Sequence, residues 1–270
     1  MFRFKYVFLF ILFSFFTTRY VIAQEHHSEE EAHHEGLHFS HPLFTESISP
    51  DTKFRFDYQY SKIDDNTKSS ELHLEYEYAF NRAFSIAVTA PYVFISETNQ
   101  NNLSNLGNIE LSFKFANYVF EHSNLLLGYG FSIGLPTGSL EKGIGSNYVT
   151  DLEPFFNIGY MINNFEFTLF STFGIPANLH QGESVENDLN LQLATIYNIT
   201  YRFQGVLEFN RESIINGNSN NSAGWYIAPG IKAVPFKNID KIILGLGIRF
   251  PLSNSREFNT QILFSTFYHF

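Results

Sequence analysis

The chain has 270 residues, no cysteine and a formal net charge of −10. The lack of cysteine excludes disulfide frameworks, Cys-ligated zinc, iron–sulfur clusters and a thiol nucleophile, and the acidic balance argues against nucleic acid as a partner. Aromatic residues make up 18% of the chain and charged residues only 16%, below the roughly 25% of a soluble domain. At a mean hydropathy of only −0.11, this composition indicates apolar and polar residues that alternate along the chain.

The first residues have the composition of a secretory signal peptide. Arg3 and Lys5 precede an apolar run over 6–16, which is about half the length that a membrane-spanning helix needs. The small residue Ala23 follows. We therefore expect a signal peptide over residues 1–23 and an exported chain that starts at Gln24.

Residues 24–51 are polar and rich in His and Glu, a composition that cannot bury a core, so we expect a flexible periplasmic segment. Neutral imidazoles and carboxylates are good ligands for Zn²⁺, Cu²⁺ or Ni²⁺, which makes this segment a candidate metal-binding tail or a flexible plug. The spacing of the histidines matches no metal site of fixed geometry. The alternative is that the segment is a solvated linker that binds metal ions only weakly. The candidate ligands are His26, His27, His33, His34, His38 and His41.

From Thr52 onward the apolar residues recur at every second position, which is the pattern of β-strands and not of helices. Twelve such segments follow one another, with tight turns after the even ones and longer polar links after most of the odd ones. Long loops on one side and short turns on the other are typical of an outer-membrane barrel. The predicted strands cover residues 53–60, 71–80, 84–94, 109–115, 125–135, 152–160, 165–173, 189–197, 203–209, 225–233, 244–252 and 258–270.

A sheet in lipid must pair every backbone N–H and C=O, so it must close. We therefore predict an all-β fold over residues 52–270, a closed antiparallel up-and-down transmembrane β-barrel of about 12 strands, with a soluble lipocalin-like barrel as the alternative. An even strand number puts both termini on one side, the periplasmic side of a Gram-negative outer membrane. The last strand carries Phe264, Tyr268 and Phe270, a ladder that resembles the signal for the barrel-assembly machinery.

The polar positions of the strands should line the lumen, and acids outnumber bases among them, so an open pore should favour cations. If residues 61–69 form the first loop, Lys53 faces Glu77 and Arg55 faces Glu75, and opposite charges meet across the strands. The alternative is that these residues form ion pairs in the wall and have no transport role. The predicted lumen residues are Lys53, Arg55, Asp57, Glu71, His73, Glu75, Glu77, Glu110, Lys114, Glu166, Asp188, Glu208, Lys232 and Arg249.

Two stretches go beyond generic barrel character: 105–114, which starts Asn-Leu-Gly-Asn, and 134–138, Gly-Leu-Pro-Thr-Gly. They resemble the outer-membrane family named after the MetA pathway of phenol degradation, where a Leu-Gly-Asp segment precedes a strand and a Leu-Pro-Thr-Gly turn follows the next one. Asn108 stands where Asp is usual. The resemblance implies an outer-membrane transporter barrel for small, often hydrophobic or aromatic, compounds.

Some outer-membrane barrels are hydrolases, but the Ser- and Asn-rich stretch 216–221, which is nearest to their constellation, has no His near it in the sequence. We therefore expect no catalytic residue, no bound cofactor and no enzymatic activity. The first hypothesis is a channel or passive transporter in contact with outer-membrane lipid, with a small molecule or ion as solute. The alternatives are a metal-binding accessory barrel for metal efflux or uptake, and a closed structural or adhesion barrel.

Overall fold

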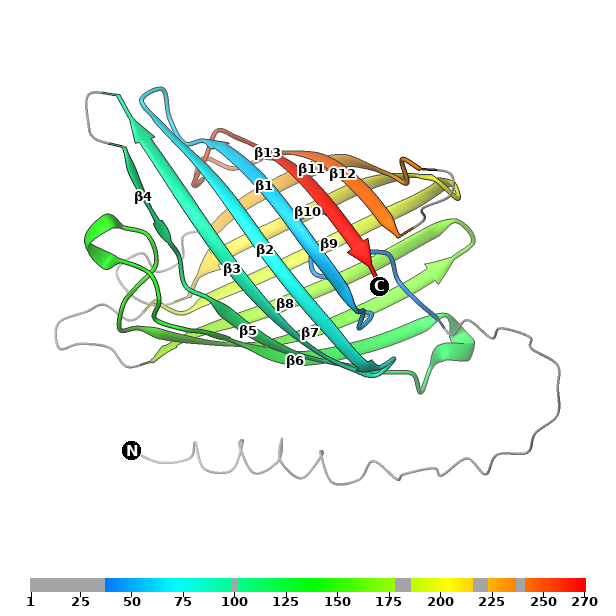
Figure 1. Ribbon diagram of the computed structural model, residues 1–270. Coiled ribbons are helices and arrows are strands. Elements are labelled where there is room, and N and C mark those ends of the chain that lie inside the picture. Colours follow the sequence, from blue (N-terminus) through cyan, green and yellow to red (C-terminus); the bar gives the residue numbers. More distant parts are fainter. Residues whose placement is uncertain (1–36, 99–101, 178–185, 216–222, 237–240) are drawn as a thin grey trace. The chain divides into compact units, whose positions relative to one another are not determined.

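The computed structural model describes residues 37–98, 102–177, 186–215, 223–236 and 241–270. The predicted signal peptide, His26, His27, His33, His34 and the stretch 216–221 lie outside these residues. Two short 3-10 helices, η2 (Glu121–Ser123) and η3 (Leu140–Lys142), accompany the strands, and no described helix is long and apolar enough to cross a membrane. The strands (Figure 1) are β1 (Lys53–Lys62), β2 (Thr67–Asn81), β3 (Phe84–Glu97), β4 (Leu103–Leu106), β5 (Glu110–Asn117), β6 (Leu125–Gly134), β7 (Thr150–Ile162), β8 (Phe165–Ala177), β9 (Asp188–Thr200), β10 (Phe203–Ile214), β11 (Ala223–Ala233), β12 (Ile242–Pro251) and β13 (Thr260–His269).

The strands form one antiparallel sheet that closes on itself, because β1 pairs with β2 on one side and with β13 on the other. β5 pairs with the first half of β3 and β4 with its second half, so β4 and β5 together occupy one strand position in the barrel. The fold is therefore a closed antiparallel barrel of 12 strands, as predicted. We call the end where β1 starts and β13 finishes the termini end, and the opposite end the loop end.

The predicted register of the first hairpin is confirmed: Lys53 is opposite Glu77 and Arg55 is opposite Glu75. The ion pairs are less symmetrical than the register suggests. Lys53 Nζ binds both Glu77 and Glu75, at 2.8 Å from Glu75 Oε1, whereas Arg55 Nε lies 2.8 Å from Asp57 Oδ2 on its own strand.

The loop that follows β6 binds the residues between β4 and β5, where the strand is interrupted. Asn108 Oδ1 accepts hydrogen bonds from the backbone N–H groups of Gly138 (3.2 Å) and Ser146 (2.9 Å), and Ile109 N donates to Thr137 Oγ1 (2.8 Å). A Cβ at Gly145, whose φ is +65°, would lie 2.6 Å from Asn108 Oδ1. The two stretches that carry the family resemblance therefore bind each other, and the fourth strand starts earlier than predicted, at Leu103.

The outer surface is apolar and rich in aromatic side chains. Rings stack between neighbouring strands, with centroids 4.7 Å apart for Phe84 and Phe115 and 4.8 Å apart for Phe113 and Phe131. Charged side chains are buried on the inner face instead, where Lys53, Glu77 and Glu208 are fully enclosed. Apolar outside and polar inside is the reverse of a soluble domain and is the arrangement of transmembrane barrels.

Residues 37–51, which we call the plug, lie inside the barrel at the termini end, so the structure differs from the expectation of a flexible segment that reaches residue 51 (blue in Figure 1). Phe39 and Ile48 pack with Ala116 and Leu126 of the wall, and all four are buried. The prediction extended the composition of 24–36 too far along the chain, because apolar residues recur every four or five positions from Phe39.

Glycines in the wall make room for the plug. A Cβ at Gly159 would lie 2.8 Å from the Phe39 ring, one at Gly128 would lie 2.9 Å from Ile48 Cγ1, and one at Gly245 would overlap Leu43. Any larger residue at these positions would have to displace the plug.

Candidate functional site

The strongest contact between plug and wall is at Glu208 of β10, which is completely buried. Its carboxylate accepts hydrogen bonds from the backbone N–H groups of Leu43 (2.9 Å), Phe44 (3.0 Å) and Thr45 (2.6 Å). A buried carboxylate is tolerated only when it is paired or hydrogen-bonded, and bonds to an ionised acceptor are about twice as strong as neutral ones. Glu208 therefore fixes the innermost turn of the plug.

Glu166 of β8 holds the entry of the plug in the same way. One oxygen accepts the Ser40 backbone N–H at 2.7 Å, and the other accepts the Ser40 hydroxyl at 3.0 Å and Asn198 Nδ2 at 2.8 Å. Two acids that were predicted to line the lumen thus bind main-chain donors of the plug.

Basic side chains of the wall bind plug acceptors. Lys114 Nζ lies 2.8 Å from Glu46 Oε1, Lys232 Nζ donates to the His41 carbonyl at 2.6 Å, and Arg55 donates to the Leu43 carbonyl. Burial opposes ionisation of Glu46, but the charges of Lys114, Lys53 and Arg55 outweigh it and hold the pKa of the carboxyl well below its ordinary value. The plug is therefore held by ionised pairs as well as by apolar contacts.

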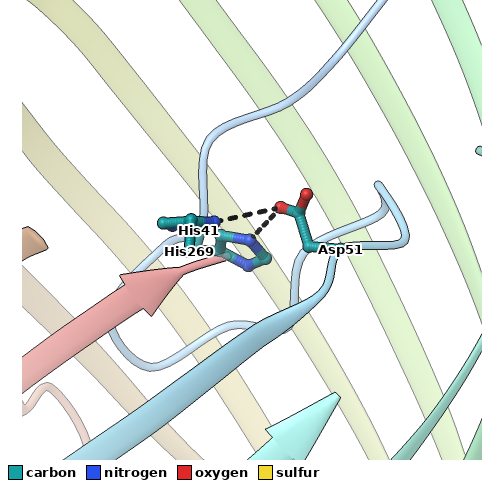
Figure 2. A group of neighbouring side chains, drawn as sticks. All are labelled: His41, Asp51 and His269. Atoms are coloured by element: carbon teal, nitrogen blue, oxygen red, sulfur yellow. Dashed lines mark hydrogen bonds and ion pairs between the residues drawn. The ribbon is translucent and has the colours of Figure 1, made fainter. Parts of the chain in front are cut away.

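The plug returns to the wall at Asp51, where three imidazoles meet (Figure 2). Asp51 Oδ2 lies 3.0 Å from His38 Nε2, 2.6 Å from His41 Nε2 and 3.8 Å from His269 Nδ1. Burial opposes ionisation of Asp51, but hydrogen bonds from His38 and His41 hold its pKa well below the ordinary value. Burial lowers the pKa of His41 to about 3, so its ring is neutral at physiological pH.

Cavities extend from the plug to the loop end. One of about 320 Å³ lies directly against Leu43 and Phe44 of the plug, and a neighbour of about 230 Å³ reaches Glu110 and Glu153. A third cavity, of about 630 Å³, lies at the loop end and is lined by Asp188, Glu212 and Glu257 among others. The part of the lumen beyond the plug therefore contains space lined by carboxylates.

Arg249 is one of four basic side chains that line these cavities, with Arg55, Lys114 and Arg256. It forms an ion pair with Glu212, and its guanidinium lies 4.3 Å from the Tyr226 ring centroid. Carboxylates outnumber the basic groups among the residues that line the three cavities.

The fold is shared with outer-membrane channels and porins. No family profile matches the sequence, and no curated protein does. The crystal structure of an outer membrane channel from Pseudomonas putida F1 matches with 12% identity and a TM-score of 0.64, over 84% of this chain and 97% of that one. The NanC porin (11% identity, TM-score 0.55, 81% and 98% coverage) and the KdgM porin (10%, 0.55, 81% and 99%) also match. The chain therefore has the barrel fold of these channels and porins. At such identities the likeness concerns the fold alone.

The structure places each predicted lumen residue on the inner face, buried or half-buried: Lys53, Arg55, Asp57, Glu71, His73, Glu75, Glu77, Glu110, Lys114, Glu166, Asp188, Glu208, Lys232 and Arg249. Several of them bind the plug and are therefore not free to meet a solute. The aromatic ladder of Phe264, Tyr268 and Phe270 lies exposed on the outer face, and its role in assembly stays a prediction.

Of the predicted metal ligands, the structure brings His38 and His41 together, and it adds two residues that the sequence reasoning missed, Asp51 and His269. His269 is separated from the others by the whole barrel sequence. It could have been found only by pairing the first and last strands, which places it opposite Lys53.

A serine motif of hydrolases also escaped the sequence reasoning. Residues 130–134 read Gly-Phe-Ser-Ile-Gly, which has the spacing of a nucleophile elbow, but the elbow needs a sharp strand-to-helix turn. Ser132 lies inside β6 and its hydroxyl is 2.8 Å from that of Ser112. This local geometry is not that of a nucleophile.

Proposed function

We propose that the protein is a passive channel of the outer membrane that passes small solutes and that residues 37–51 close from its termini end. The observation that carries this proposal is a polar, charged lumen with one cavity at the loop end and another directly against the plug. An apolar outer surface and a polar interior suit a barrel in lipid that conducts water-soluble species. No catalytic step is part of the proposal.

The lumen beyond the plug should prefer cations. Carboxylates of Glu110, Glu153, Asp188 and Glu257 line its cavities, and rings of acidic side chains favour cations in channels. Arg249 is neutralised by Glu212 and contributes little opposing charge.

The plug is held by contacts that can be broken and reformed. Its bonds to Glu208, Glu166 and Lys114 are hydrogen bonds and ion pairs, and its apolar side chains sit against glycines of the wall. The closed state in the structure is therefore one state of a gated channel in this proposal.

The location and partners follow from the same proposal. We expect the barrel in outer-membrane lipid, inserted by the barrel-assembly machinery, with the termini end in the periplasm and the loop end outside. The mutual contacts of Asn108 with Gly138 and Ser146 give the family resemblance a structural basis, and membership of that family stays a prediction.

Single-channel conductance in a planar bilayer under a salt gradient tests the proposal. The mature chain is compared with a deletion of residues 24–50, which removes most of the plug, and with a control deletion of 24–36, which keeps it. We expect few openings from the mature chain and the control, and frequent cation-selective steps after deletion of 24–50. Silence from the 24–50 deletion would favour the closed structural barrel, and full conductance of the mature chain would refute closure by the plug.

A further inference from the structure

The two ends of the plug and the last strand of the barrel lie close together at the termini end. His38 and His41 belong to the entry of the plug, Asp51 to its exit and His269 to β13. The ligand atoms of His41, Asp51 and His269 all lie within 4.8 Å of one another, and Asp51 Oδ2 lies 3.0 Å from His38 Nε2. Figure 2 shows the His41 and His269 rings on one side of the Asp51 carboxylate.

We propose that His38, His41, Asp51 and His269 form a binding site for a transition-metal dication of the Zn²⁺ class. Three imidazoles and one carboxylate are a ligand set that Zn²⁺ accepts. With Zn–ligand bonds of about 2.0–2.1 Å, tetrahedral ligand atoms stand roughly 3.3 Å apart. The His41 and His269 nitrogens lie 2.6 and 3.8 Å from Asp51 Oδ2, on both sides of that value, and His38 Nε2 lies 3.0 Å from the same oxygen.

A second observation concerns one nitrogen of the His41 ring and one of the His269 ring. His41 Nδ1 and His269 Nε2 are buried and accept or donate no hydrogen bond among the described residues. Buried polar atoms without partners are uncommon, and an ion or a water molecule is a usual explanation. On each ring this is the nitrogen opposite to the one that faces Asp51, so both rings keep hydrogen-bonding capacity next to the proposed site.

Access is provided by a cavity of about 210 Å³, which His38, His41 and His269 line together with Arg202 and Lys232. A metal site needs such an entry path. The cations nearest to the imidazoles are bonded to oxygen, Lys232 to the His41 carbonyl and Lys53 to Glu75 and Glu77. Their charge is therefore partly compensated when a dication enters.

A bound ion would cross-link the plug to the wall. Because His38, His41 and Asp51 lie on the plug and His269 lies on the barrel, removal of the plug would require the loss of ligands from the ion. The site would therefore hold the plug in place while metal is present, and this inference does not depend on whether the barrel conducts.

Zn²⁺ binding to the detergent-solubilised mature protein, measured by competition with a chromophoric chelator, tests the site. The parent for this experiment carries Asn in place of His26, His27, His33 and His34, since these histidines could bind Zn²⁺ on their own. Two variants, His269→Asn and Asp51→Asn, probe the site. The control is His122→Asn, an exposed histidine at the same end of the barrel.

We expect the parent to retain one Zn²⁺ per chain and both site variants to bind at least about ten-fold more weakly, with the control unchanged. Co²⁺ in the parent should give the intense visible absorption of a tetrahedral ion, which His269→Asn should abolish. Heat-modifiable migration in gels verifies that each barrel is folded. A parent that retains no Zn²⁺, or a His269→Asn variant that binds as the parent does, would overturn the proposal.

Discussion

Replacement of Glu208 by Gln should release the plug while leaving the barrel intact. In the structure the Glu208 carboxylate accepts three backbone N–H groups, from Leu43, Phe44 and Thr45. Gln has the same shape but offers one acceptor oxygen, and its amide N–H₂ would face a backbone donor. At least one buried N–H then lacks an acceptor, and the remaining bonds lose their ionised partner.

The size of the effect follows from these bonds. An unsatisfied buried donor costs about 1–3 kcal/mol, and a hydrogen bond to a charged group is worth about 1 kcal/mol more than a neutral one. The closed state should therefore lose roughly 2–4 kcal/mol relative to the open state. Since each 1.4 kcal/mol is a factor of ten, the ratio of open to closed channels should rise about 30-fold or more.

The assay is the open probability of single channels, with Glu110→Gln as the control. Glu110 is also a lumen carboxylate, but its hydrogen bond goes to Ser112 and not to the plug, so the control removes the same charge and no plug contact. If both variants open equally often, the bonds at Glu208 do not hold the plug and the reasoning is refuted. In the 24–50 deletion, Glu208→Gln should have no additional effect on opening, because the two changes act on one interaction.

Three further outcomes are expected. Gly245→Ala places a Cβ on Leu43, which should cost the closed state about 1–3 kcal/mol and raise open probability, and in a Leu43→Ala background the same change should add little, because the clashing atoms are gone. Asn108→Ala leaves the Ser146 N–H without its acceptor and removes one of the two acceptors of the Gly138 N–H, so it should lower the thermal midpoint of the purified barrel, whereas Asn105→Ala should lower it less. In the 24–50 deletion, Glu110→Gln should shift the reversal potential towards zero, and an unchanged potential would contradict an acidic lumen.

The barrel could be predicted from the sequence because its signals are local and repeated. Period-two alternation gives the strands, and loop lengths give their order. The register of Lys53 with Glu77 follows once the first loop is assigned. The break between β4 and β5 could not be read in this way, because it depends on Asn108 meeting Gly138 and Ser146 across the loop end.

The plug was missed for a different physical reason. Composition describes the average of a segment, and the acidic, His-rich part before Leu37 dominates the average of residues 24–51. Whether a segment is buried depends instead on a few apolar side chains and on whether the barrel wall leaves space for them. Phe39 packs against Gly159, and Leu43 packs against Gly245. Glycines at inward positions of the predicted strands are the feature of the sequence that indicates space for a segment inside the barrel.

The position of the plug also changes which charged residues of the lumen can act on a solute. An excess of inward acids suggests ion selectivity when the lumen is taken as empty. With the plug in place, Glu208 and Glu166 bind its backbone donors, and Lys114 binds its Glu46. These groups can act on a solute only after the plug has left, whereas Glu110 lines a cavity in the closed state too. Selectivity and closure should therefore be separable by mutation, because they depend on different carboxylates of one wall.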